Sequence, residues 1–305
     1  MTLARSLVLL VALATPAVAG DQEAFGLLRQ AHERWNDPDP AEALRLANEA
    51  LAQNPTSKVI RTQILLFIGS LHQVKTGNLD AALERYDQII QSLVAVTDPQ
   101  LKQLKADAMV RKGNILYAER DDAAGALKLY QSANETNQLS TTQDTASQLA
   151  YRMGRDPARG QQDRQKFMDV ALKASREAVQ LAPRQFQGDE ARQAGNLAKC
   201  QLQLVIVLTA LGQGDEARTV WDSIDKARFA DAALYQRALL AALRGQADDA
   251  TALLKQFMST RPAGEDGRTA RNQLRKFIRS EPDFAALRAR PDWKELVDDE
   301  AAPRR

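Results

Sequence analysis

The side chains in this sequence that could do chemistry are few, and they lie far apart. His32 and His72 are forty residues apart, and neither has an acidic residue three or four positions further on. A metal-binding pair on one helix needs that close spacing, so we interpret both histidines as structural or surface residues. Cys200 lies in an apolar stretch, where a buried and unreactive thiol is expected. A single cysteine also excludes a disulfide framework.

The motifs of common catalytic sites are missing from the sequence. It contains no GxxxxGK[ST], HExxH or GxSxG, and no GxGxxG after a strand. The acidic pairs Asp248-Asp249 and Asp298-Asp299 fit surface positions or helix starts. A hydrolase would need a cluster of acid, base and nucleophile that these residues do not supply. The sequence therefore predicts a protein that is not an enzyme and that has neither a cofactor nor a metal site.

The composition favours helices. Apolar residues make up 44% of the 305 positions and aromatic residues only 5%, with 15 Gly and 11 Pro. A chain with so few turn-forming residues is unlike an all-β sandwich. The 41 Lys and Arg against 39 Asp and Glu leave a net charge of +2. Such a balance argues against nucleic acid or a membrane surface as the partner.

The first twenty residues have the three regions of a secretory signal peptide. Arg5 supplies the positive start, Leu7–Ala14 is an unbroken apolar run, and Ala17-Val18-Ala19 is a small-x-small cleavage pattern. The run is far shorter than the roughly 20 residues that span a bilayer. We therefore predict that residues 1–19 are removed after Ala19. The mature chain would be periplasmic or secreted and would have no membrane anchor.

A short pattern recurs six times along the chain. An alanine is followed four residues later by a second small or bulky residue and three residues after that by a third. The copies are Ala43-Ala47-Ala50, Ala82-Tyr86-Ile89, Ala126-Tyr130-Ala133, Ala171-Ser175-Ala178, Ala217-Trp221-Ile224 and Ala250-Leu254-Phe257. Steps of four and three place the three residues on one helical face, and the alanine lets another helix approach closely. Each copy predicts the second helix of a pair, and Gly77, Gly212 and Gly245 predict tight turns just before three of the copies.

The last copy carries the fullest version of the pattern. Gly245 stands five residues before Ala250, and Leu254, Phe257 and Pro262 follow at +4, +7 and +12. This arrangement resembles the second half of the tetratricopeptide repeat. The resemblance implies an all-α fold, a right-handed α-solenoid of antiparallel helix pairs with a concave face for protein recognition. The first-helix half departs from the family, because its Trp and Leu-Gly positions are missing.

The pattern predicts about six helix pairs over residues 20–262. Residues 134–165 are polar and interrupted by glycine and proline, so we expect a long irregular loop around a first helix at about Thr142–Met153. Arginines in and after this helix could bind an anion, although nearby acids favour an ordinary solvated loop; they are Arg152, Arg155, Arg159 and Arg164. Residues 298–305 are expected to be a frayed tail.

Residues 263–297 are expected to close the helical array. Phe284, Leu287, Trp293 and Leu296 fall in two short amphipathic segments, and Pro291 suits the first turn of the second segment. A repeat array needs an atypical terminal unit to cover its last apolar face. The segment also resembles the closing unit of many bacterial tetratricopeptide proteins. Capping therefore explains these residues better than ligand binding does.

The resemblance places the first helix of each pair on the concave face. The partner-binding residues expected there are Ile64, Phe67, Ile68, Leu71, Arg111, Ile115, Leu202, Ile206, Tyr235 and Leu239. A mostly apolar lining suits an amphipathic helix or an extended segment of a partner protein. The same residues could instead pack against neighbouring helices, and the sequence leaves that alternative open.

Trp221 occupies the second position of the fifth copy. We expect it to be buried between helix pairs, so that truncation to alanine would cost roughly 3–5 kcal/mol.

The functional hypothesis from the sequence is a non-catalytic scaffold of the bacterial cell envelope that binds a protein or peptide through the concave face. An alternative is an accessory subunit of an envelope enzyme or of a secretion or assembly complex. The sequence does not identify the partner in either case.

The signal-peptide hypothesis gives the first testable prediction. In a bacterial host, the exported protein should begin at Gly20, and its N-terminal sequence should read GDQEAF. Edman sequencing or intact mass of the periplasmic fraction measures this directly. Soluble cytoplasmic protein that retains Met1 would contradict it.

Overall fold

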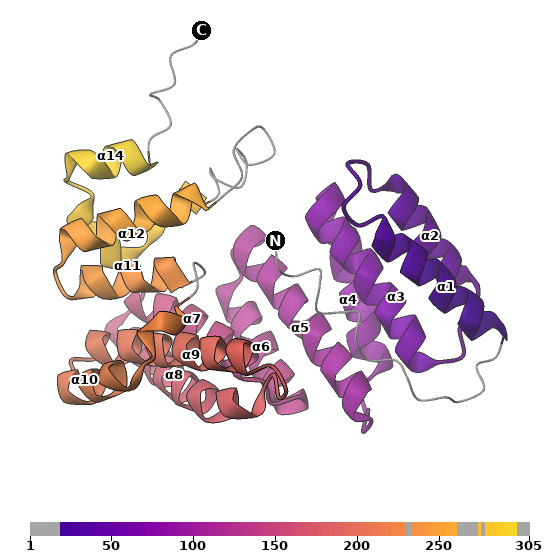
Figure 1. The fold of residues 1–305 in the computed structure, drawn as a ribbon, viewed down its shortest axis with the longest axis horizontal. Coiled ribbons are helices and arrows are strands. Elements are labelled where there is room, and N and C mark those ends of the chain that lie inside the picture. Colours follow the sequence, from indigo (N-terminus) through magenta and orange to yellow (C-terminus); the bar gives the residue numbers. More distant parts are fainter. Residues whose placement is uncertain (1–18, 230–232, 261–273, 276–277, 298–305) are drawn as a thin grey trace, which may run out of the picture. The chain divides into compact units, whose positions relative to one another are not determined.

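The computed structural model describes residues 19–229, 233–260, 274–275 and 278–297 (Figure 1). Every regular element in this part of the chain is a helix, which confirms the all-α expectation. The signal peptide predicted over residues 1–19 lies outside the described residues except for Ala19. The expected tail, residues 298–305, also lies outside them, as does most of the segment before Ile278.

The chain divides after Arg120 into two compact units. The first unit contains α1 (Ala19–Glu33), α2 (Ala41–Ala52), α3 (Lys58–Leu71), the π-helical turn η1 (His72–Thr76), α4 (Leu79–Ser92) and α5 (Pro99–Glu119). Within it α1 packs on α2, α3 on α4, and α5 on both α3 and α4. The division falls between the two helices that the sequence assigns to the third pair.

The second unit begins with α6 (Ala123–Thr136), α7 (Ser140–Arg155), α8 (Gln161–Leu181), η2 (Ala182–Arg184) and α9 (Glu190–Ala210). It continues with α10 (Gly214–Ser223), η3 (Lys226–Arg228), α11 (Leu234–Leu243), α12 (Ala247–Ser259), η5 (Pro282–Leu287) and α14 (Pro291–Val297). Helix α6 packs on α7, α7 on α8, α8 on α9, α9 on α10 and α11 on α12, and α9 also packs on α7 and α11 (Figure 1).

The helix expected at about Thr142–Met153 is present as α7, but the long irregular loop expected around it within residues 134–165 is much shorter than predicted, because α6 extends to Thr136 and α8 begins at Gln161. Helix α7 runs from Ser140 to Arg155, and only residues 156–160 separate it from α8. The polar residues that made this stretch look solvated are largely buried, and several bond to neighbouring helices. Ser147 Oγ, for example, donates to the carbonyl of Ala171 in α8 at 3.0 Å. Such hydrogen bonds compensate the cost of removing polar groups from water.

Local side chains set the helix starts and turns. Ser57, Asn78, Asp98, Asp122 and Asp189 each accept a hydrogen bond from the amide three residues on, which caps α3, α4, α5, α6 and α9. Glycines with positive φ stand at the predicted tight turns, and these are Gly77, Gly212 and Gly245. The turn positions expected from the sequence are therefore confirmed.

The recurring pattern packs the helices together. All six leading alanines are buried, with 0–4% of their surface exposed. The second position is buried in five copies, and the third is buried in all but the last, where Phe257 is half-buried. Gly69 shows how close this packing is, because a Cβ there would lie 2.7 Å from Cε1 of Tyr86 on α4.

Trp221 is the exception at the second position. It is half-buried, so the expectation that it lies buried between helix pairs is wrong. Helix α10 ends two residues later, and the ring lies beneath the long side chains of Lys226 and Arg244. The first and third residues of this copy, Ala217 and Ile224, are buried, so the predicted face of α10 does point toward the core. A truncation at Trp221 should consequently cost less than the sequence suggested.

The C-terminal segment covers the end of the second unit, as expected. Phe284, Leu287, Trp293 and Leu296 are all buried, and Pro291 begins α14. Segment η5 packs on α11 and α12, and α14 packs on α12. η5 also contacts α7, a helix far earlier in the chain, which the sequence pattern did not predict.

Phe67 provides a test of the core in the first unit. Its ring is 3% exposed and lies 4.1 Å from the ring of His32 and 5.6 Å from that of Trp35, measured between centroids. Phe67→Asp would bury a charge without a partner, so we expect a loss of roughly 3–5 kcal/mol in the free energy of unfolding. Val74→Asp is the control, because Val74 is 62% exposed and should change stability by less than about 0.5 kcal/mol. Urea unfolding measures both variants, and equal stabilities would contradict this packing.

Candidate functional site

The residues expected to line an open concave face are mostly covered by the chain's own helices. Eight of the ten are buried, namely Ile64, Phe67, Ile68, Leu71, Ile115, Leu202, Ile206 and Leu239. The four on α3 belong to one apolar core with residues of α1 and α2. The stripe therefore packs between helices, which is the alternative that the sequence left open. These eight side chains, as placed, do not form an exposed binding surface.

The remaining two, Arg111 and Tyr235, are half-buried and bonded to other helices. Arg111 donates from Nη1 to Ser70 Oγ at 3.0 Å and from Nε to Asp107 at 3.2 Å, which ties α5 to α3. Burial opposes its charge, but Asp107 and Tyr86 outweigh burial and raise its pKa. Tyr235 donates its hydroxyl to Glu281 at 2.7 Å. Both residues stabilise the fold through these contacts.

A buried polar cluster fixes the C-terminal segment to α7 and α11. Tyr151 and Arg155 both bond the carboxylate of Asp283, with Arg155 Nε at 2.8 Å. Arg152 donates to Ser280 at 2.6 Å, and its Nε lies 3.9 Å from Glu281. We name this cluster the C-terminal clasp, and its residues are Tyr151, Arg152, Arg155, Tyr235, Ser280, Glu281 and Asp283. The anions that Arg152 and Arg155 bind are thus carboxylates of the same chain.

Glu281 is the most constrained acid of the clasp. Its side chain is buried, and its Oε1 has no hydrogen-bond partner, whereas Oε2 accepts from Tyr235. Burial raises the pKa of Glu281 above its ordinary value, although Arg152 and Tyr235 act in the opposite direction. Burial beside Asp283 also raises the pKa of Tyr151 well above its ordinary value. These groups hold the segment in place, because most of their bonding capacity is used within the clasp.

A second set of buried polar groups links α7, α9 and α11. Gln236 on α11 donates to Gln203 on α9 at 3.2 Å, and Gln203 donates to Ser147 on α7 at 3.4 Å. Lys199 pairs with the buried Asp144 at 2.7 Å. Such contacts require one register between neighbouring helices. Cys200 lies beside this pair, and burial raises its pKa to about 12, which keeps the thiol protonated and unreactive.

The two histidines do not approach a metal-binding arrangement. His32 packs on Phe67, and burial lowers its pKa. Burial together with the charge of Arg85 lowers the pKa of His72. Across the described residues, no three His, Cys, Asp or Glu side chains are grouped as metal ligands would be.

The strongest candidate for a binding site surrounds Trp221. Arg244 from α11's C-terminal end lies 4.8 Å from the Trp221 ring centroid, and Lys226 Nζ lies 4.9 Å from it. Phe229 stacks at a tilt 6.2 Å away, and Arg237 of α11 lies 5.6 Å from the Phe229 ring. We name these five residues the Trp221 cluster. Trp221, Phe229 and Arg237 are half-buried, whereas Lys226 and Arg244 are exposed.

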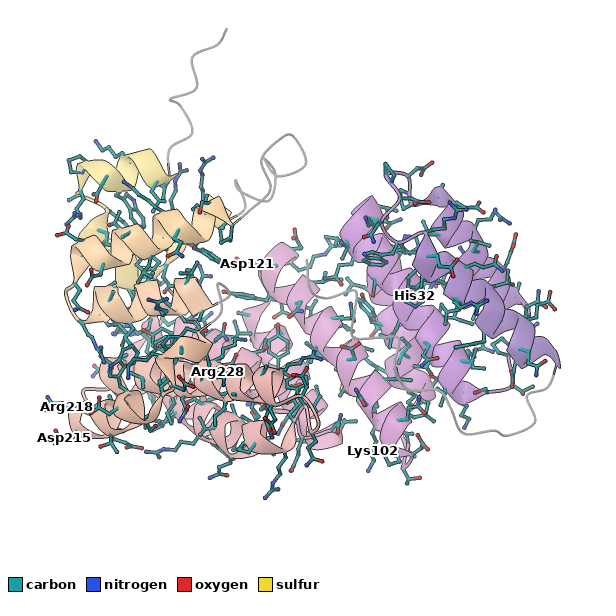
Figure 2. All side chains as sticks on the ribbon, in the orientation of Figure 1. His32, Lys102, Asp121, Asp215, Arg218 and Arg228 are labelled. Carbon is teal, nitrogen blue, oxygen red and sulfur yellow. The ribbon has the colours of Figure 1, made fainter. Side chains whose placement is uncertain are left out.

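Figure 2 shows the side chains around this region, with Arg218 of α10 and Arg228 of η3 labelled. Sequence reasoning missed the site because the cluster joins two helix pairs. Trp221, Lys226 and Phe229 come from the fifth pair and its following turn, but Arg237 and Arg244 come from the sixth. The available signal was the polar run after Trp221, which carries a second aromatic residue and several cations. It does not reveal which cations reach the ring.

Comparison of the sequence with protein-family models and with curated proteins finds no match. Along the described residues, no helix combines the length and apolar character that crossing a membrane requires.

The buried Glu281 predicts a pH dependence of stability. Because its pKa in the folded chain exceeds the ordinary 4.5, the folded state holds this proton more tightly than the unfolded state. Glu281 thus favours folding below about pH 4.5, and this contribution is lost as the pH rises through the folded pKa. Relative to Glu281→Gln, the wild-type chain should lose stability from pH 4.5 to pH 7. Urea unfolding of both across this range measures the difference, and a difference independent of pH would contradict the burial of a titrating carboxyl.

Proposed function

We propose that this chain is a non-catalytic protein-binding scaffold that holds its partner at the Trp221 cluster. The observation that carries this proposal is the departure of one repeat from the packing of the others. Five of the six second-position residues are buried between helices, whereas Trp221 is half-buried and surrounded by basic side chains. An aromatic residue that is not needed to fill a helix seam is available to a partner.

The composition of the cluster matches what carries energy in protein interfaces. Tryptophan and arginine are enriched among the residues whose truncation weakens complexes most. A ring flanked by long basic side chains also offers apolar area and hydrogen-bond donors in one place. The proposal places recognition here rather than on the stripe of α3, α9 and α11, because that stripe is buried by the chain's own helices.

We further propose that the chain is an exported protein of the bacterial cell envelope and a relative of the tetratricopeptide proteins. The six buried leading alanines and the glycine turns support the second point, with a right-handed arrangement of pairs expected from that resemblance. The position of Asp21 is compatible with cleavage after Ala19. Asp21 accepts hydrogen bonds from the amides of Thr56 and Ser57, so the contacts of α1 begin just after the proposed cut.

Alternatively, the partner is part of an envelope enzyme or of a secretion or assembly complex. The protein described here would then be an accessory subunit of that enzyme or complex. That role uses the same surface and is distinguished by the identity of the captured protein. Affinity capture of the tagged chain from a periplasmic extract, followed by mass spectrometry, identifies it.

Trp221→Ala tests the proposal. We expect the captured partner to fall at least about tenfold, because a central aromatic residue of an interface is removed. Unfolding in urea should show a modest loss, since the ring is only half-buried.

Trp35→Ala is the matched control for this variant. Trp35 is also half-buried and has Lys75 over its ring at 5.8 Å, but it lies in the first unit. Its truncation should leave capture unchanged. Equal capture by wild type and Trp221→Ala, with both folded, would overturn the proposed site.

A further inference from the structure

The cations of the Trp221 cluster have aromatic rings as neighbours, whereas many other basic residues of this chain pair with carboxylates. Arg45, Arg155, Arg176 and Arg290 each form an ion pair with an acid at 3.0 Å or less. Within the described residues, Lys226, Arg237 and Arg244 form no ion pair. Their charged groups instead lie 4.8–5.6 Å from the ring centroids of Trp221 and Phe229. Among the described residues, positive charge therefore gathers around two rings with no carboxylate in ion-pair contact with it.

The acid that precedes Lys226 in the sequence is already placed differently. Asp225 accepts the amide of Ala227 at 3.1 Å and pairs with Arg228 at 3.3 Å. Lys226 keeps its ammonium near the ring by donating to the carbonyl of Trp221 at 3.1 Å. That contact and the ring leave donors of Lys226 for a further acceptor, because an ammonium group has three. Arg237 and Arg244 carry five donors each.

Resting on the proposed function, we infer that the Trp221 cluster binds an acidic segment of the partner protein. Its carboxylates would bond Lys226, Arg237 and Arg244, and its apolar atoms would pack on Trp221 and Phe229. Charge-assisted bonds to carboxylates are stronger than those between neutral groups. The rings would reduce the contact of these bonds with water, which strengthens them further.

The C-terminal clasp shows the same chemistry within this chain. There two arginines and two tyrosines hold the acidic segment of Glu281 and Asp283, and the neighbouring Phe284 packs edge-on against Tyr235 with centroids 6.0 Å apart. In the clasp the acidic side chains of Glu281 and Asp283 are buried, whereas Lys226 and Arg244 of the Trp221 cluster are exposed. An acidic segment that also carries an apolar side chain fits both arrangements.

The chain as a whole does not favour polyanions. Its 41 basic residues are nearly matched by 39 acidic ones, and a surface for nucleic acid or anionic lipid would need a broader excess of positive charge. The three cations of the cluster form a local patch. A short peptide segment is therefore the occupant that its charge and its aromatic content favour.

The test uses the mature chain and two synthetic peptides. One is rich in glutamate and contains one phenylalanine, and in the other every glutamate is replaced by glutamine. Binding is followed by tryptophan fluorescence, with Trp221→Phe identifying the contribution of Trp221. We expect the acidic peptide to bind at least about tenfold more tightly, and this preference should shrink as salt is raised. Equal binding of the two peptides, or binding of neither, overturns the inference.

Arg237→Glu combined with Arg244→Glu should reduce binding of the acidic peptide at least about tenfold. Arg218→Glu is the control, because Arg218 is an exposed cation on the same helix as Trp221 but outside the cluster. It should bind like wild type. Circular dichroism must show that all variants are folded, and Arg244→Lys alone should retain most binding. An equal loss in Arg218→Glu would overturn the assignment to the cluster.

Two further outcomes separate the inference from the proposed function. If Trp221→Ala loses the captured partner but the double arginine variant retains it, the inference of an acidic segment is overturned. The proposed binding site at the Trp221 cluster is then retained. If vesicles containing phosphatidylglycerol bind with the same dependence on Arg237 and Arg244, a lipid surface replaces the acidic peptide as the occupant.

Discussion

Close contact between helices at small residues is the constraint on which the rest of this structure depends. The leading alanine of each copy is buried, and the residue four positions later fills the space beside it in five of the six copies. Helices can approach this closely only where side chains are small, as Gly69 against Tyr86 shows. Each seam then removes apolar surface from water, which is the main source of stability in a chain with few aromatic residues.

Buried polar groups give the second unit a feature that alanine seams lack. An apolar seam tolerates small shifts along the helix axes, whereas a hydrogen bond between Gln203 and Gln236 does not. The ion pair of Lys199 with Asp144 adds a charged contact between α9 and α7. Pairs of this kind contribute less to net stability than to a unique arrangement, because both charges had to leave water. The clasp extends the same principle to the C-terminal segment, which it fixes to α7 as well as α11.

The fifth repeat relaxes the common packing at its second position, and the proposed binding site lies there. In the fifth copy the second position holds a large ring at the end of a short helix, and basic side chains from the next turn and the next pair cover it. Repeat proteins can vary one unit without disturbing the others, because each unit contacts mainly its neighbours. A binding surface can therefore arise in one unit while the remaining seams keep the chain folded.

The sequence alone determined the helical class, the positions of the six small-residue faces, the glycine turns and the burial of the closing segment, because these follow from local periodicity and backbone preference. It did not determine what covers each apolar stripe. Phe67 and Leu202 look the same in sequence whether they face a partner or a neighbouring helix, and only the tertiary structure shows them buried. The sequence placed a helix at about Thr142–Met153, but it did not show that the polar side chains of α7 are buried, because their hydrogen-bond partners lie on α8 and α9. The Trp221 cluster could not be predicted from the sequence for the same physical reason. Arg237 and Arg244 reach the rings only after two helix pairs have packed together.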